Sequence, residues 1–594
     1  MSLRPDNPLI VQSDRTMMLH TVRAVVDANG AQAKDENGQP LTEAHPRYGE
    51  ARDALALFAE LEKSPNYLHT YRVTPVSVWN AAALGVDAER IEGILDEYAC
   101  IPVPQEVKDQ VRQWLDRYGM LRILRAESED GSGRFELSSE DPEVLQDVLG
   151  YREVAGLCDV DSEGRAWVTD LSRGAVKHAL IKVGYPVDDR GGYLDGDALE
   201  VRLRSTTLGG KAFGLRPYQE DAAAAFHAGG SVVGGNGVVA LPCGAGKTVV
   251  AMGVMSLLQT KTLILTTNTV AVRQWHQELL DKTELTEDQV GEYTGDEKIV
   301  KPVTITTYQM LTWRPSKTAE FQHFSLFGKE NWGLVVYDEV HLLPAPVFRV
   351  TADLQARRRL GLTATLVRED GKEDEVFCLI GPKRFDVPWK VLEAQGFIAT
   401  ATCVEVRVPL EDSLKSTYRS ADARGKFRIA SENPRKLEVI RQLIENHPQG
   451  RILIIGQYIS QLELLARALK APMIAGKTPT AERQKLYQAF RDGSEPLLIV
   501  SKVGNFAIDL PDANVAIQVS GTFGSRQEEA QRLGRILRPK SDGAAAVFYS
   551  VVTEGSKDQE FAQKRQLFLT EQGYCYQIID SQRLASFVSQ GGTP

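Results

Sequence analysis

Short, continuous apolar runs alternate with helical stretches over the C-terminal two thirds of the chain, and this pattern occurs twice. The first series begins at Val238–Leu241 and extends to about Ile380. The second series restarts at Ile452–Ile455 and continues to Ala545–Tyr549. Uninterrupted apolar runs of this kind are typical of parallel strands that helices cover on both faces. The chain is therefore predicted to contain two tandem α/β domains, each built on a parallel sheet.

The first 205 residues have a different organisation. From Tyr48 to Arg125 the pattern is helical, with helices expected to start near Thr74, Asp87 and Pro104. Three short helices suit a winged-helix-like module and suit a plain helical bundle equally well. Residues 134–205 mix strand and helix signals, which predicts a second accessory domain of mixed α/β type.

These patterns divide the chain of 594 residues into four predicted domains. They are an N-terminal helical domain at 1–127, a mixed domain at 134–205 and two parallel-sheet domains at 206–390 and 391–594. The last contains a short insertion, 413–436, with seven basic and two acidic residues. This insertion could contact a polyanion, or it could simply be a solvated charged surface.

Composition excludes several classes of protein. The formal net charge is −10, so a nucleic-acid-binding role requires basic residues concentrated along a track on an acidic body. The six cysteines are scattered and form no C-x-x-C pair, which argues against a disulfide framework, a zinc site and an iron–sulfur cluster. No apolar run is long enough to span a membrane, which needs roughly 18–20 residues. The cytoplasm is the expected compartment.

A phosphate-binding loop is predicted at P-C-G-A-G-K-T, between an apolar run and a helical stretch. Gly244 and Gly246 let the backbone turn so that several N–H groups point at one phosphate, and the following helix N-terminus adds its dipole. Lys247 would neutralise the β- and γ-phosphates of ATP, and Thr248 would ligate Mg²⁺. Leu241 stands where the strict motif has its first glycine, so an ordinary strand-to-helix turn is the alternative.

A pair of carboxylates is expected at the C-terminal edge of the first sheet, where open α/β folds bind ligands. Asp338 would hold Mg²⁺ and Glu339 would polarise the attacking water. An acidic pair after a strand can also be a helix cap. Its position downstream of Lys247, followed by His341, favours catalysis.

Further nucleotide contacts are predicted from both parallel-sheet domains. Arg535 and Arg538 lie three apart and so share one helix face, which can supply an arginine finger for phosphoryl transfer. The alternative is a solvated basic helix surface, to which Arg532 is assigned. Three residues are predicted to contact the nucleotide or its water: Gln219 the adenine, Asp509 the ribose, and Gln531 the nucleotide or water.

Polar residues that end strands are candidates for contact with nucleic acid, because hydroxyls, amides and arginines bind phosphates and sugars without reading sequence. Each could also serve ordinary loop chemistry. The candidates in the first sheet domain are Thr267, Arg273, Gln274, Thr306, Thr307 and Gln309, with His341, Thr363 and Thr365 as residues that couple nucleotide to nucleic acid. Those in the second are Gln457, Ser501, Lys502 and Asn505.

Taken in order, these motifs resemble those of superfamily 2 helicases. The series is L-R-P-Y-Q (215–219), P-C-G-A-G-K-T (242–248), D-E-V-H (338–341), T-A-T (363–365) and Q-R-L-G-R-I-L-R (531–538). Within that superfamily, Arg368-Glu369-Asp370 resembles the R-E-D motif of XPB-type DNA repair helicases. Other similar segments are Pro8–Asp14, Phe58–Asn80, Leu392–Ala399 and Phe561–Tyr576.

The resemblance implies two RecA-like motor domains that use ATP and Mg²⁺ to unwind DNA, usually 3′ to 5′, at single-stranded/duplex junctions in nucleotide excision repair. It implies that Arg368, Glu369 and Asp370 help to separate strands. It also implies a damage-recognition-like domain at 134–205 and a short basic thumb at 413–436. The chain looks like a bacterial or archaeal form, and a nuclease is a candidate partner because archaeal relatives have one.

Two other functions fit the same motifs. A duplex-DNA translocase, or an ATP-driven conformational switch that loads partner proteins, would share every ATPase motif with a helicase. An RNA helicase of the D-E-x-H type is a third hypothesis, which the R-E-D motif and the N-terminal domains disfavour.

Overall fold

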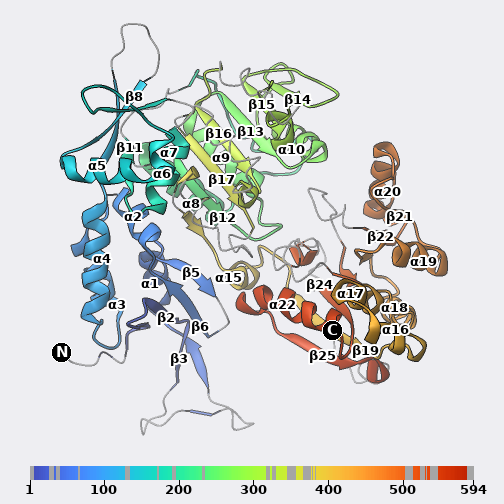
Figure 1. Cartoon of the computed structure of the whole chain (residues 1–594). Helices are drawn as coiled ribbons and strands as arrows, with labels where there is room; N and C mark the ends of the chain where they lie inside the picture. The colour runs from blue at the N-terminus through green and yellow to red at the C-terminus, as the bar shows by residue number, and fades with distance from the viewer. Residues whose placement is uncertain are drawn as a thin grey trace. The chain divides into compact units, whose positions relative to one another are not determined.

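The computed structural model describes two compact units, drawn in Figure 1. The first contains two N-terminal modules and a seven-stranded sheet, and the second contains another seven-stranded sheet. The second unit is formed by residues 387–594 together with two short earlier segments, 241–247 and 364–370. No helix in the described part of the chain is long and apolar enough to cross a membrane. The described residues are 4, 6–25, 33–34, 41–63, 67–83, 85–126, 134–169, 173–189, 196–230, 234–315, 322–323, 330–343, 356, 358–364, 376, 379–381, 383–501, 513–521, 529, 532–534 and 546–584.

The N-terminal module combines helices with a four-stranded antiparallel sheet, in the order β1-β2-β6-β5. The three helices expected from the sequence are present. Asp87 caps one of them by accepting a hydrogen bond from the backbone N–H of Arg90, because its carboxylate satisfies a donor that has no partner within the helix. The elements are β1 (Leu9–Val11), β2 (Thr16–His20), α1 (Tyr48–Leu55), β5 (Glu60–Lys63), β6 (Leu68–Arg72), α2 (Pro75–Ala83), α3 (Ala88–Tyr98) and α4 (Gln105–Arg117), and β3 (Val22–Ala24) pairs with β4 (Thr42–Ala44).

The second module has a five-stranded mixed sheet in the order β11-β7-β8-β10-β9. Strand β7 (Leu121–Arg125) pairs with β8 and β11, so this sheet includes residues that the predicted boundaries placed in the N-terminal domain. The other elements are β8 (Arg134–Ser139), α5 (Pro142–Gly150), α6 (Arg152–Ala155), β9 (Asp159–Val160), β10 (Ala166–Thr169), α7 (Arg173–Lys182) and β11 (Val187–Asp189).

The first large sheet is parallel throughout, in the order β14-β15-β13-β16-β17-β12-β18. Every residue of β13 and β15 is buried, as the continuous apolar runs predict for strands covered on both faces. The elements of this domain are α8 (Pro217–His227), β12 (Asn236–Ala240), α9 (Lys247–Leu258), β13 (Thr262–Thr266), α10 (Thr269–Lys282), β14 (Val290–Tyr293), β15 (Val303–Thr307), α11 (Tyr308–Leu311), β16 (Leu334–Asp338), η2 (Val340–Leu342), β17 (Arg358–Thr363) and β18 (Lys383–Asp386).

The second large sheet is also parallel, in the order β21-β22-β20-β23-β24-β19-β25. Two parallel seven-stranded sheets confirm the predicted fold class. The elements are α15 (Trp389–Ala394), β19 (Ala401–Val408), η4 (Asp412–Leu414), α16 (Lys415–Ser420), α17 (Ala423–Ser431), α18 (Lys436–Glu445), β20 (Ile452–Ile455), α19 (Ile459–Leu469), β21 (Met473–Ile474), α20 (Thr480–Asp492), β22 (Leu497–Val500), β23 (Val515–Gln518), β24 (Ala546–Thr553), α22 (Lys557–Glu571), β25 (Tyr576–Asp580) and η6 (Ser581–Arg583).

Candidate active site

The predicted phosphate loop joins β12 to α9 by a tight turn. Gly244 and Gly246 have φ angles of 82° and 79°, in the left-handed region that side chains disfavour. The backbone N–H of Ala245 donates to the carbonyl of Pro242 at 3.1 Å, which closes the turn. Helix α9 begins at Lys247, so the N–H groups of its first turn, which have no acceptor within the helix, lie next to the turn and can bind an anion.

Asp338 is the last residue of β16 and is held from two directions. Trp275 Nε1, on α10, donates to Asp338 Oδ2 at 3.0 Å. The hydroxyl of Tyr308 donates to the main-chain carbonyl of Asp338 at 2.8 Å. Burial raises the pKa of Tyr308 well above its ordinary value, so the phenol remains a donor at neutral pH. One carboxylate oxygen is therefore oriented by an indole, and the strand end is fixed by a phenol.

Glu339 follows with a backbone that is unfavourable for its residue type. Its φ and ψ are 52° and 51°, a left-handed conformation that costs a non-glycine residue roughly 1–2 kcal/mol. The side-chain atom Oε2 is buried and has no hydrogen-bond partner in the described part of the chain. Strain and an unsatisfied carboxylate oxygen together at one residue are typical of functional sites.

His341 connects this carboxylate to the T-A-T motif. Its Nδ1 lies 3.4 Å from Glu339 Oε2 and 3.1 Å from the hydroxyl oxygen of Thr363, the last residue of β17. Both His341 and Thr363 are buried. The predicted coupling residues His341 and Thr363 are thus brought together with the predicted catalytic residue Glu339.

Gln219 lies in the first turn of α8 and is buried. Its Oε1 accepts a hydrogen bond from the backbone N–H of Arg216 at 3.0 Å, which satisfies a helix-terminal donor. The neighbouring Leu215 packs against α9, because a Cβ added to Gly253 would lie 3.1 Å from Leu215 Cδ1. The L-R-P-Y-Q motif therefore packs, through Leu215, against α9, the helix that follows the phosphate loop.

The predicted nucleic-acid contacts of the first sheet lie in different environments. Thr267 accepts a hydrogen bond from Asn268 Nδ2 at 3.2 Å, and Thr307 caps α11 by accepting from the N–H of Met310 at 3.1 Å. Arg273 is partly exposed and lies 3.6 Å from Asp296. Gln274 is half-buried on α10.

In the second unit, Ser501 follows β22 and is buried, and its hydroxyl has no hydrogen-bond partner among the described residues. Arg532 contradicts the prediction of a solvated surface, because it is fully buried and donates to Gln518 Oε1. Other predicted site residues lie outside the described residues: Thr365, Arg368, Glu369, Asp370, Lys502, Asn505, Asp509, Gln531, Arg535 and Arg538.

The residues of the first sheet fit a bound nucleotide and divalent cation. The turn before α9 presents backbone N–H groups next to a lysine, and Asp338 and Thr248 supply the hard oxygen ligands that Mg²⁺ prefers. Glu339 Oε2 is buried and accepts no hydrogen bond from the described residues, although His341 Nδ1 lies 3.4 Å away, so it can receive a hydrogen bond from water. Since β12 and β16 are parallel and both border β17, these groups follow the same edge of one sheet.

Comparison with known proteins matches three family models. ERCC3/RAD25/XPB C-terminal helicase matches residues 392–590, type III restriction enzyme, res subunit, matches 212–368, and helicase conserved C-terminal domain matches 35–162.

Curated relatives match over nearly the whole chain. "DNA 3′-5′ helicase XPB" of Kineococcus radiotolerans is 50% identical over 590 residues, covering 99% of this chain and 98% of the relative. The protein of the same name from Mycobacterium tuberculosis is 49% identical over 580 residues, covering 98% and 99%. The chain belongs to the XPB helicase family. A more distant XPB relative, the IIH helicase/translocase subunit of Saccharomyces cerevisiae, is 30% identical over 610 residues, covering 92% of this chain and 70% of the relative.

Two site residues of this XPB-family chain were not predicted from its sequence. Trp275 and Tyr308 directly follow the predicted contacts Gln274 and Thr307, yet both point to Asp338. A buried aromatic residue with a polar edge needs a hydrogen-bond partner, and that requirement is the signal that could have found them.

Proposed function

We propose that this protein is an ATP- and Mg²⁺-dependent DNA helicase that moves 3′ to 5′ and acts in DNA repair of the nucleotide-excision type. The observation that carries the proposal is the contact series Glu339–His341–Thr363 at one sheet edge. It connects the residue assigned to hydrolysis with the residue assigned to nucleic-acid coupling. Family membership and the ordered motifs support the same conclusion.

The nucleotide would be held by this chain's own groups as follows. The N–H groups at Gly244 to Lys247 and the Lys247 ammonium would bind the phosphates. Thr248 and Asp338 would ligate Mg²⁺, which neutralises charge on the phosphates when bound. The Asp338 carboxylate is already oriented by Trp275, so little ordering entropy is lost on binding.

Glu339 would orient the attacking water through its unpartnered Oε2. An unsatisfied buried oxygen is costly, and a water that donates to it regains this free energy. His341 would then couple a change in the hydrogen bonding of Glu339 to Thr363, because its Nδ1 lies within 3.4 Å of Glu339 Oε2 and 3.1 Å of the Thr363 hydroxyl oxygen. In the sequence, Thr363 is followed after four residues by the R-E-D segment (368–370), which is proposed to assist strand separation.

The test is ATP hydrolysis by the full chain without nucleic acid and with single-stranded DNA, duplex DNA, forked DNA or RNA of matched sequence. Fork opening is scored in the same reactions, on forks with either a 3′ or a 5′ loading strand. The expected result is stimulation by DNA but not by RNA, with opening of 3′-tailed forks. Glu339→Gln should remove hydrolysis and opening together.

Other outcomes would contradict the proposal in different ways. DNA-stimulated hydrolysis without fork opening would replace the helicase by a duplex translocase or an ATP-driven loading switch. Equal stimulation by RNA and DNA would contradict the DNA assignment. Hydrolysis at the wild-type rate by Glu339→Gln would contradict the catalytic assignment itself.

A further inference from the structure

Helices α16 and α17 carry the exposed basic side chains of the 413–436 segment. We call residues 412–431, which include η4, the basic helix pair. Arg419 and Arg424 are exposed and Lys426 is half-buried, and none of the three forms an ion pair within the described part of the chain. They are therefore available to a polyanion, unlike Arg428, which pairs with Glu432 at 3.0 Å.

The opposite face of α17 packs on the body of the second unit through aromatic rings. Phe427 is buried, and its ring lies 4.9 Å from that of Phe561 on α22 and 6.1 Å from that of Tyr458. Such contacts hold a helix against its neighbour but specify its position poorly, because apolar attraction is not directional. Directional contacts are needed to fix the helix in one place.

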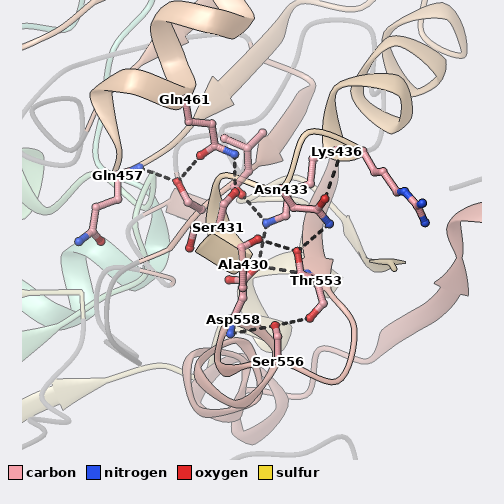
Figure 2. Close-up of polar contacts among 12 residues, drawn as sticks. Ala430, Ser431, Asn433, Lys436, Gln457, Gln461, Thr553, Ser556 and Asp558 are labelled. Atoms are coloured by element: carbon pink, nitrogen blue, oxygen red, sulfur yellow. Dashed lines mark hydrogen bonds and ion pairs between the residues drawn. The ribbon is translucent and has the colours of Figure 1, made fainter. Parts of the chain in front are cut away.

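Those contacts are made at the C-terminus of α17, where backbone carbonyls have no partner within the helix. The hydroxyl of Thr553, the last residue of β24, donates to the carbonyl of Ala430 at 2.6 Å. Gln461 Nε2, on α19, donates to the carbonyl of Ser431 at 2.7 Å. Figure 2 shows both side chains reaching the same end of the helix.

Gln461 is buried and uses its other amide atom as well. Its Oε1 accepts a hydrogen bond from the hydroxyl of Ser520 at 2.8 Å, and that hydroxyl accepts one from the N–H of Gln457 at 2.9 Å. Gln461 therefore joins the basic helix pair to Ser520, in the segment that follows β23.

The same strand end is contacted by the motif that carries the predicted arginine finger. Arg532 Nη1 lies 3.5 Å from the carbonyl oxygen of Ser520 and also donates to Gln518 Oε1. Arg532 stands three positions before Arg535 in Q-R-L-G-R-I-L-R. A continuous series of buried hydrogen bonds thus runs from Ser431 through Gln461 and Ser520 to Arg532.

A second contact reaches this strand end from the helix after the basic pair. Lys436 Nζ, at the start of α18, donates to the carbonyl of Val519 at 2.8 Å and to Asp558 Oδ2 at 2.7 Å. Residues 519 and 520 are therefore held by Lys436 on one side and by Gln461 on the other, both from buried positions.

We propose that Gln461 and Ser520 are positioning residues that bind the basic helix pair to the end of β23, so that DNA contact at the helix pair is transmitted to the arginine-bearing motif. The inference rests on the proposed helicase function. DNA phosphates would be bound by Arg419, Arg424 and Lys426, while Gln461 touches neither DNA nor nucleotide.

The first experiment separates the two hydrogen bonds of Gln461. Gln461→Met removes both, and Gln461→Glu keeps the acceptor for Ser520 but loses the donor to Ser431. The half-saturating concentration of single-stranded DNA for ATPase stimulation should rise about fivefold to tenfold in both variants, because both lose the hydrogen bond to Ser431. A change of this size corresponds to the loss of one buried hydrogen bond. Turnover without DNA should stay at the wild-type level.

Gln484→Glu is the matched control, since Gln484 is exposed on α20 and its side chain forms no hydrogen bond with the described residues. It should leave the half-saturating DNA concentration unchanged. An unchanged value in both Gln461 variants as well would overturn the inference.

A double-mutant cycle then tests whether Gln461 acts through the basic helix pair. Arg424→Ala alone should raise the half-saturating DNA concentration. If Gln461 works by placing Arg424, adding Gln461→Met to Arg424→Ala should raise it by less than the product of the two separate factors. If the increase in the double variant equals the full product of the two separate factors, Gln461 does not act by positioning Arg424. Ser520→Ala should reproduce Gln461→Met, and the pair together should be no worse than either alone.

Amide hydrogen exchange tests the positioning role of Gln461 independently of whether the proposed helicase function is correct. If the wild-type chain shows no DNA-stimulated hydrolysis, the proposed function has failed. Gln461→Met should still speed amide exchange in residues 423–431 and leave residues 480–492 unchanged, because the carbonyl it loses ends α17. Unchanged exchange in 423–431 would overturn the positioning role by itself.

Discussion

The two seven-stranded sheets have the same strand arrangement, yet the polar residues at the carboxyl ends of one equivalent pair of strands, β16 and β23, differ in their hydrogen bonds. Strands β16 and β23 occupy the same place in their sheets and end at Asp338 and Gln518. After Asp338 comes Glu339, strained and with an unpartnered buried oxygen. The side chain of Gln518 is bonded at both ends, to Glu529 and Arg532.

We call the edge that holds Asp338 and Glu339 the reactive edge, after its proposed role, and the edge at Gln518, Val519 and Ser520 the rigid edge. A buried acceptor without a partner costs about 1–3 kcal/mol, and this cost is acceptable where a substrate water is to be bound. A network whose members are bonded to one another holds its elements in one arrangement. If Glu339 has its proposed catalytic role, the first sheet gives up stability at this strand end for chemistry, while the second uses the same topology to fix the position of attached groups.

The largest expected effect is on the reactive edge. Glu339→Gln should lower DNA-stimulated ATP turnover by about 10²–10⁴-fold, because general-base assistance is removed. The free energy of unfolding should stay the same or rise, since the amide carries no buried charge. Steady-state hydrolysis and urea unfolding measure the two quantities. A large loss of stability would mean that Glu339 belongs to a structural network like that of the second sheet.

A substitution at the rigid edge should lower the free energy of unfolding, which Glu339→Gln should not do. Burial lowers the pKa of Lys436 while the Asp558 carboxylate opposes that shift, and both side chains are only 1% exposed. Lys436→Met should lower the free energy of unfolding by about 3–5 kcal/mol, because it leaves Asp558 buried without its cation.

Two variants complete that measurement by urea unfolding. Lys436→Met combined with Asp558→Leu should recover much of the loss, since no unpaired charge then remains. Lys485→Met, at an exposed lysine of α20, should change little. A loss of equal size at Lys485 would show that the effect is not specific to burial.

The ends of β17 and β24 allow a matched pair of smaller changes. Thr363 and Thr553 are the last residues of β17 and β24, strands that occupy the same place in the two sheets. The hydroxyl of Thr363 is hydrogen-bonded to His341, and that of Thr553 to the carbonyl of Ala430. Replacing either by Val should cost about 1 kcal/mol of unfolding free energy. Only Thr363→Val should also lower ATP turnover at saturating DNA. Equal effects on turnover would erase the distinction between the edges.

The smallest effects are expected at exposed arginines of the two units. Arg273→Ala and Arg424→Ala should each reduce the slope of DNA affinity against salt concentration by about one, as loss of one phosphate contact predicts. Each should change unfolding free energy by less than about 0.5 kcal/mol. A salt titration of DNA binding checks both. An unchanged slope for one variant would mean that its arginine does not contact a DNA phosphate.

Local sequence was sufficient to place Lys247 and Asp338 in the fold, while their roles remain predictions. A phosphate loop and an acidic pair each follow directly on an apolar strand, so Lys247 and Asp338 could be placed on the sheet without knowledge of distant contacts. Trp275 could not be assigned to Asp338, because that contact depends on where α10 packs against the sheet. The strained backbone of Glu339 likewise has no sequence signal.

The rigid edge was harder to predict, because its charged residues resemble surface residues in composition. Lys436 was counted among the basic residues of an insertion, yet it shares a helix face with Val439, Ile440 and Leu443. That spacing was available in the sequence, and it places the lysine on the buried face. Arg532 has no such local sign, since its partners Gln518 and Ser520 come from another strand end.

The order of strands in the first sheet also has a consequence for biosynthesis. Strand β12 is the first of its sheet to be translated, but its neighbours are β17 and β18, the last two. During translation both edges of β12 therefore remain unpaired while β13 to β16 are synthesised, because its partner strands are not yet present. Unpaired edges of apolar strands associate readily with other chains. The nascent protein is therefore most vulnerable to aggregation just before Asp386 emerges, and a chaperone that shields β12 during that interval would raise the yield of folded protein.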